Sequence, residues 1–166
     1  MACPRSASDQ QKVGMALEVL RTQGRVRFAA RGYSMLPSLW PGDVVTVEAQ
    51  STDQFQSGDL LLYVREERFF LHRMLRNEEC GVEARWLMRG DSMPHADQPV
   101  SAHQIVGKVV EVERDGRRLP GIPRCTLPVR AAGFLLCWDR LRSVVLRLRE
   151  SRHTRPDASP VTSISI

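Results

Sequence analysis

The sequence predicts a mainly β domain of coiled sheets, with a short N-terminal helix and a C-terminal amphipathic helix. Between Arg25 and Arg118, six short segments are rich in β-branched and aromatic residues, and Gly- or Asp-containing turn signals separate them. Apolar residues recur at helical spacing only on either side of this region. The chain has 166 residues, of which 42% are hydrophobic, enough for one compact domain with its own core.

The N-terminal segment, residues 1–24, predicts one short helix over 9–23. Asp9 is suited to cap its start, and Gly24 is suited to end it. The expected buried face of this helix consists of Val13, Leu17 and Leu20. The polar N-terminus lacks the apolar core of a signal peptide, and no apolar run approaches the roughly 20 residues of a transmembrane helix. We therefore expect a cytoplasmic protein.

The β domain is predicted to span residues 25–119. Its expected strands are 25–30, 43–49, 59–66, 68–75, 82–89 and 104–113. The strand containing His72 alternates so that Phe70, His72 and Met74 share one face.

Proline and glycine interrupt the chain at 119–128, and a linker with a basic amphipathic helix is predicted over 120–150. The apolar face of that helix would consist of Phe134, Trp138, Leu141, Val145 and Leu148. The last segment, 151–166, is predicted to be a disordered tail.

The positive charge of the chain is concentrated near its C-terminus. The net charge is +5, yet residues 1–128 are nearly neutral, whereas residues 129–155 carry seven arginines against Asp139 and Glu150. We expect no nucleic-acid partner for the main body of the chain. The basic segment either contacts an anionic membrane surface peripherally or docks on its own domain.

The four cysteines are scattered and form neither a CxxC pair nor a Cys/His spacing suited to zinc. We interpret them as reduced thiols, and we expect no metal and no cofactor.

The most informative segment is RGYSMLPSLWPGD, which begins at Arg31 and leads into a strand. Ser34 lies in a proline-limited turn, where a serine can be exposed as a nucleophile provided that a base lies nearby. Candidate partners follow in the chain: His72 in FLHR, then Asp91 and Asp97 in RGDSMPHAD, and finally the strand IVGKV.

This ordered set of motifs resembles the type I signal peptidase superfamily, over residues 25–112. The histidine before Arg73 is similar to the archaeal and endoplasmic-reticulum type, whereas the bacterial type has lysine there. The resemblance implies that Ser34 is the nucleophile, His72 its general base and Asp97 the residue that orients the imidazole. No metal is implied.

Two further residues are expected to support this site. Asp91 matches the Gly-Asp aspartate of the family, and the resemblance implies a structural or supporting role for it. Signal peptidases often have Ser-Gly before the nucleophile, where this chain has Gly32 and Tyr33, an arrangement closer to LexA-type repressors. Tyr33 is accordingly grouped with Asp91 as a supporting residue.

Two residues imitate catalytic positions and are not favoured. Ser92 lies in a similar Ser-Met pair, but no Gly-Asp opens a strand eight residues later, as Gly42-Asp43 does after Ser34. Lys108 belongs to the IVGKV strand and not to the position of the base. Asp43 and Asp59 are interpreted as turn formers before strands.

The predicted function is that of a serine endopeptidase that cuts an extended peptide or preprotein segment with small side chains near the cut. The alternative is a LexA-type regulatory module, or a non-catalytic peptide-binding module, on the same fold. Only about 24 residues precede the first strand, which is too few for the helix-turn-helix domain of a repressor.

Overall fold

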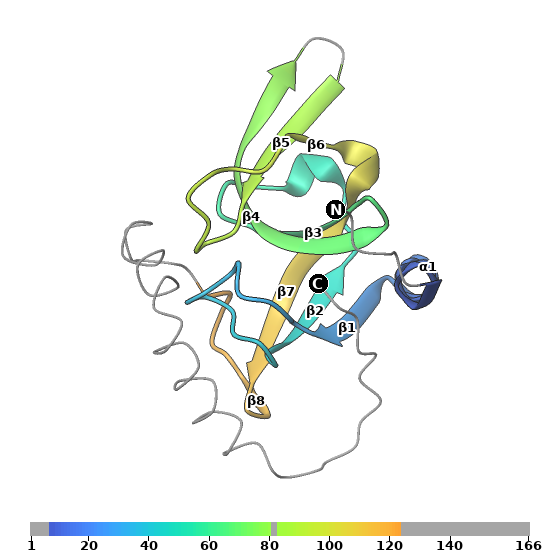
Figure 1. The fold of residues 1–166 in the computed structure, drawn as a ribbon, viewed down its shortest axis with the longest axis vertical. Helices are drawn as coiled ribbons and strands as arrows, with labels where there is room; N and C mark the ends of the chain where they lie inside the picture. The colour runs from blue at the N-terminus through green and yellow to red at the C-terminus, as the bar shows by residue number, and fades with distance from the viewer. Residues whose placement is uncertain (1–6, 81–82, 124–166) are drawn as a thin grey trace.

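The computed structural model describes residues 7–80 and 83–123 and confirms a mainly β architecture. One helix precedes a single antiparallel sheet (Figure 1). The elements are α1 (Ala7–Gln23), β1 (Arg25–Ala29), β2 (Val44–Glu48), η1 (Thr52–Gln54), β3 (Leu60–Arg65), β4 (Arg68–Cys80), β5 (Glu83–Arg89), β6 (Val100–Ser101), η2 (Ala102–Gln104), β7 (Ile105–Arg114) and β8 (Arg117–Arg118).

The six predicted strands correspond to β1, β2, β3, β4, β5 and β7. Along the sheet the order is β1-β2-β7-β3-β4-β5-β6, and β8 pairs with β7. The short strands β6 and β8 were not predicted, because two residues carry no recognisable alternation.

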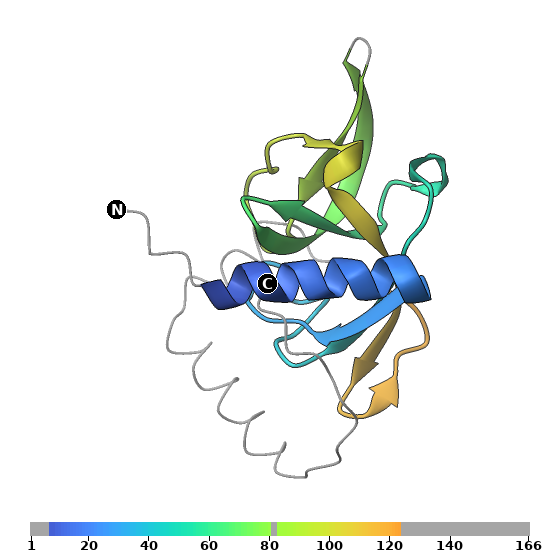
Figure 2. The same cartoon turned by 90° about the vertical axis from the view of Figure 1, so that its right-hand side faces the viewer.

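Helix α1 differs from its prediction in two details. It begins at Ala7, so Asp9 lies inside the helix and does not cap it. Leu17 is 38% exposed, whereas Ala16 and Leu20 are buried, so the expected buried face was wrong at Leu17. The helix lies across the sheet beside β1 (Figure 2). Its buried residues Ala16 and Leu20 belong to the same core as Val26 and Phe28 of that strand. Gly24 ends the helix as expected, with φ 71° and its N–H donating to the Leu20 carbonyl.

The β3–β4 hairpin has two buried faces, each belonging to a different core. A two-residue turn at Glu66 and Glu67, both with positive φ, sets the register in which Leu61 pairs with His72. One face contributes Leu60, Leu62, Phe69 and Leu71 to a core shared with α1, β1, β2 and β7. The other contributes Leu61, Tyr63, Phe70 and Met74 to a core shared with β5 and β6. His72 lies on this second face, together with Phe70 and Met74 as predicted.

The two Gly-Asp pairs form matching turns at the starts of β2 and β3. Asp43 accepts a hydrogen bond from the Trp40 N–H (2.8 Å), and Asp59 accepts one from the Gln56 N–H (2.9 Å). Each carboxylate also binds a cation from β7. The pairs are Asp43 with Arg114 (2.7 Å) and Asp59 with Lys108 (2.8 Å). Both aspartates thus form turns as predicted, and β7 anchors both of them.

The predicted amphipathic helix within 120–150 and the predicted tail at 151–166 lie outside the described residues, apart from 120–123. In the part of the chain that the structure describes, no helix is both long and apolar enough to cross a membrane.

Candidate active site

Ser34 lies in the long connection between β1 and β2, whose base is closed by backbone pairing. The Ala30 N–H donates to the Asp43 carbonyl (2.7 Å), and the Gly42 N–H donates back to Ala30 (2.9 Å). Within the loop, the Leu39 N–H donates to the Met35 carbonyl (3.0 Å), and both of these side chains are buried. The apolar side of the turn therefore anchors it, while Ser34 itself is partly exposed.

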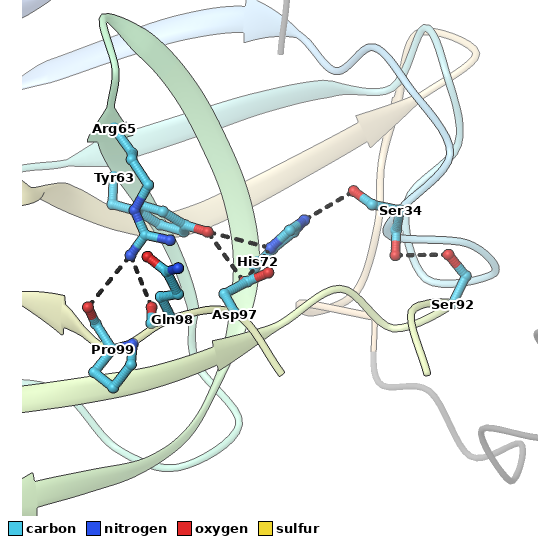
Figure 3. A network of polar contacts seen from close by, with 8 residues as sticks. All are labelled: Ser34, Tyr63, Arg65, His72, Ser92, Asp97, Gln98 and Pro99. Carbon is cyan, nitrogen blue, oxygen red and sulfur yellow. Dashed lines mark hydrogen bonds and ion pairs between the residues drawn. The ribbon is translucent and has the colours of Figure 1, made fainter. Parts of the chain in front are cut away.

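His72 connects Ser34 with Asp97. The His72 Nε2 atom is 3.0 Å from Ser34 Oγ, and its Nδ1 atom is 2.6 Å from Asp97 Oδ2 (Figure 3). An ionised carboxylate can only accept, so the geometry assigns the imidazole proton to Nδ1. Nε2 is then the acceptor for the Ser34 hydroxyl, which is the arrangement that a general base requires.

Asp97 lies on the loop between β5 and β6, not on a strand. Its backbone N–H donates to the Met88 carbonyl (2.8 Å), and its side chain is 22% exposed. The three residues predicted as nucleophile, base and orienting acid thus converge from three separate segments. Their chemical roles stay predictions.

The sequence analysis missed Tyr63 as a neighbour of this site. The Tyr63 hydroxyl donates to Asp97 Oδ2 (3.0 Å), the same oxygen that binds His72. Burial, reinforced by the Asp97 carboxylate, raises the pKa of Tyr63 well above its ordinary value of 10.0. The phenol therefore stays protonated, and stays a donor, at every pH at which a histidine base would work. The available signal was the Glu66–Glu67 turn, which places Tyr63 on the same face as His72.

Ser92, the serine not favoured as nucleophile, holds the backbone of Ser34 in place. Its N–H (2.9 Å) and its hydroxyl (2.8 Å) both donate to the Ser34 carbonyl, and the hydroxyl also contacts the Tyr33 carbonyl (2.9 Å). The side chain is buried, with 3% exposed. The adjacent Gly90 lies so close that a Cβ there would be 2.6 Å from the Ser34 carbonyl oxygen. Residues 90–92 and the turn that contains Ser34, called the serine turn below, are therefore packed backbone to backbone.

Asp91 lies in this same segment but contacts Arg73, not His72. The Arg73 guanidinium binds both of its carboxylate oxygens (2.8 and 2.7 Å), and both side chains are largely buried. Arg73 also donates to the carbonyls of Gly58 (2.7 Å) and Pro123 (2.9 Å). Asp91 is thus placed to support the loops around the site and not to act on the imidazole.

The other two sequence candidates are accounted for differently. The backbone carbonyl of Tyr33 accepts a hydrogen bond from the Ser92 hydroxyl, and Tyr33 is 38% exposed. Lys108 lies on β7 and forms an ion pair with Asp59, the residue before β3.

A small cavity of about 20 Å³ opens beside Ser34, and Arg31 and Gly32 also line it. Its apolar lining comes from Ala30, Met35, Leu39, Trp40 and Leu71. That volume exceeds the 10–15 Å³ that one water molecule needs, yet it leaves no room for a large side chain.

In the ranges 7–80 and 83–123, no three His, Cys, Asp or Glu side chains gather in a way that could hold a metal ion. Comparison with known proteins finds neither a matching family model nor a matching curated protein.

Proposed function

We propose that this chain is a serine endopeptidase with a signal-peptidase-like fold, in which Ser34, His72 and Asp97 form the catalytic triad. The observation that carries the proposal is the continuous line from Ser34 Oγ through the His72 ring to Asp97, with contacts of 3.0 and 2.6 Å. His72 is buried, and both of its ring nitrogens are engaged, one by a serine hydroxyl and the other by a carboxylate. A Ser–His–Asp triad requires both contacts.

The reaction follows from these positions. Ser34 Oγ attacks the carbonyl carbon of the scissile peptide bond while His72 Nε2 takes the hydroxyl proton. Asp97 stabilises the resulting imidazolium. The imidazolium then gives its proton to the leaving amine, which breaks the C–N bond and leaves an acyl-enzyme on Ser34. Water, deprotonated by the same imidazole, hydrolyses this ester and restores the serine.

The backbone N–H of Ser34 is the proposed donor to the oxyanion. Removal of one such donor typically costs about 10²–10³ in rate, so its direction matters. The Ser34 N–H shares its peptide plane with the Tyr33 carbonyl, and the Ser92 hydroxyl contacts that carbonyl (2.9 Å), so Ser92 restrains the direction of this N–H.

The small cavity beside Ser34 supports substrates with a small apolar side chain at the residue that is acylated. A cavity of about 20 Å³ is small, and Met35, Leu39 and Leu71 in its lining are buried, which favours a small apolar side chain there. The proposed substrates are therefore extended peptides with alanine-sized residues at the cut.

The test is covalent labelling with a fluorophosphonate, which reacts with activated serines. We expect stoichiometric labelling of the wild type, mapped to Ser34 by peptide mass spectrometry, and no labelling of Ser34→Ala or His72→Ala. Ser57→Ala is the matched control, because Ser57 is exposed and contacts only the Leu75 carbonyl through its hydroxyl (2.6 Å). Label on Ser92 would overturn the assignment of the nucleophile. A folded wild type that takes no label would instead support the non-catalytic peptide-binding alternative.

A further inference from the structure

Asp97 lies on a loop, and its position is determined by contacts with strand β3. The loop after β5 has only turns and bends before β6 begins at Val100. A loop carboxylate that must orient an imidazole within a few tenths of an ångström needs support from rigid elements. Two side chains of β3, Tyr63 and Arg65, reach this loop (Figure 3).

Tyr63 contacts the carboxylate itself. Its ring is 1% exposed and stacks on Phe70, with centroids 5.5 Å apart and planes inclined by 17°. The Tyr63 and His72 rings lie edge to face, with their centroids 6.1 Å apart. The hydroxyl lies 3.0 Å from Asp97 Oδ2 but 3.4 Å from His72 Nδ1, so the carboxylate is its better acceptor.

Arg65 contacts the backbone just after Asp97. It donates to the carbonyl of Gln98 at 2.7 Å and lies within 3.3 Å of that of Pro99. Its guanidinium also lies over the Tyr63 ring, 5.8 Å from the centroid. Because residues two apart share a face of a strand, Tyr63 and Arg65 reach the loop from the same side.

We propose that Tyr63 and Arg65 are positioning residues that hold Asp97 against His72, one through the carboxylate and the other through the following backbone. This inference rests on the proposed peptidase function, since positioning matters only if the imidazole acts as a base. Neither residue touches Ser34 in this arrangement, and neither exchanges a proton with substrate.

Removal of the phenol should change both the geometry and the charge of the acid–imidazole pair. Oδ2 is shared by the His72 N–H and the Tyr63 hydroxyl, so the phenol withdraws part of the carboxylate charge from the imidazole. Without it, the carboxylate favours the imidazolium more strongly, and a neutral base forms only at higher pH. Among the described residues, Arg65 from β3 lies over the Tyr63 ring, and Arg73, next to His72 on β4, is engaged by Asp91.

The first experiment measures the rate of Ser34 labelling from pH 5 to 9 for the wild type and Tyr63→Phe. The variant keeps the ring and its stacking but lacks the hydroxyl. We expect a labelling rate about 10- to 100-fold lower, the size of a lost hydrogen bond to a charged group. The acid limb of the profile should move to higher pH. Trp86→Phe is the control, because Trp86 is buried in the same core, whereas the side-chain hydrogen bonds of Asp97 are with Tyr63 and His72. It should lower stability and leave the acid limb in place.

The backbone contact is tested with a matched pair of arginines. Arg65→Ala should lower the labelling rate, and Arg65→Lys should restore part of it. Arg68→Ala should leave the rate unchanged, since Arg68 is the exposed cross-strand neighbour of Arg65.

A measurement independent of activity separates this inference from the proposed function. The His72 Nδ1 proton, hydrogen-bonded to Asp97, should give a low-field proton resonance that is absent from His72→Ala. In Tyr63→Phe we expect this proton to exchange with water at least about tenfold faster, because its acceptor is held less firmly. If the wild type takes no label but the resonance responds, the peptidase proposal fails, and only the physical part of this inference stands, namely that the Tyr63 hydroxyl holds Asp97 against His72. A resonance and an acid limb that are both unchanged in Tyr63→Phe would overturn the positioning role.

Discussion

At the scale of single residues, the two aspartates of the RGDSMPHAD segment have separate partners. Asp97 faces the imidazole, whereas Asp91 neutralises the buried guanidinium of Arg73. Removing one member of a buried ion pair leaves the other uncompensated. Replacement of Asp97 should therefore lower the rate of Ser34 labelling, whereas replacement of Asp91 should lower the stability of the fold.

We expect Asp97→Asn to remain folded and to lose about 10⁴-fold in labelling rate, because an amide favours the wrong imidazole tautomer. Asp91→Asn should instead lower the free energy of unfolding by about 3–5 kcal/mol while the folded fraction keeps most of its labelling rate. Urea unfolding and labelling kinetics on the same samples separate the two effects. If Asp91→Asn lost more labelling rate than Asp97→Asn while both stayed folded, the two roles would have to be exchanged.

Tyr63 should also make stability depend on pH in the alkaline range. Its folded pKa is raised above the unfolded value of 10.0, so the stability that it contributes is complete below pH 10 and is lost as pH rises further. Above pH 10 the unfolded chain releases a phenolic proton that the folded chain keeps. The free energy of unfolding should fall by up to about 1.4 kcal/mol per pH unit from this group.

In Tyr63→Phe this contribution is absent, so the curve of stability against pH should be shallower between pH 10 and 11.5. Urea unfolding at half-unit steps, followed by far-ultraviolet circular dichroism, measures the slope. Parallel curves for the two proteins would contradict the burial of the phenol.

At the scale of elements, the site depends on the close contact between the serine turn and the segment that follows β5. Glycine at position 90 permits this contact, because any Cβ there would meet the Ser34 carbonyl oxygen at 2.6 Å and the Ser34 Cβ at 3.0 Å. Both neighbours belong to the serine turn, so a side chain at position 90 must push that turn away from its place.

Gly90→Ala should consequently lower the labelling rate of Ser34 by at least about tenfold, since a displacement of about 1 Å can cost 10²-fold. Gly14→Ala is the matched control: the added Cβ meets nothing within 4 Å, and the position lies in α1. It should stabilise the chain by about 0.5–1 kcal/mol and leave labelling unchanged. Equal labelling rates for Gly90→Ala and wild type would show that the turn has room to adjust.

At the scale of the whole molecule, the charge of the chain is divided between a nearly neutral body and the basic segment 129–155. Each arginine near an anionic surface is worth about 1 kcal/mol, and this attraction falls off within a Debye length. We propose that this segment holds the β domain at an anionic membrane.

Co-sedimentation with vesicles tests this proposal. The full chain should sediment with anionic vesicles at low salt, should do so far less at high salt, and should not sediment with neutral vesicles. A chain truncated after Pro128 should lose this binding and keep its melting temperature. If truncation lowered the melting temperature and the full chain never sedimented, the segment would instead be docked on its own domain.

The sequence by itself determined six of the eight described strands, the two Gly-Asp turns and two of the contacts around the imidazole. Richness in β-branched and aromatic residues predicted β1, β2, β3, β4, β5 and β7, and the Gly-Asp pairs predicted the turns before β2 and β3, because both signals act over a few neighbouring residues. The order of the motifs predicted that Ser34, His72 and Asp97 belong together.

Only the tertiary structure decided what lies around these residues. The Tyr63 and Arg65 contacts with the Asp97 loop depend on the register of a hairpin and on a loop that crosses it, neither of which has a periodic signal. The same is true of Ser92, whose sequence resembles a nucleophile motif but whose buried hydroxyl serves the Ser34 carbonyl. Local pattern determines which face of a strand a residue occupies, whereas long-range packing determines which loop that face meets.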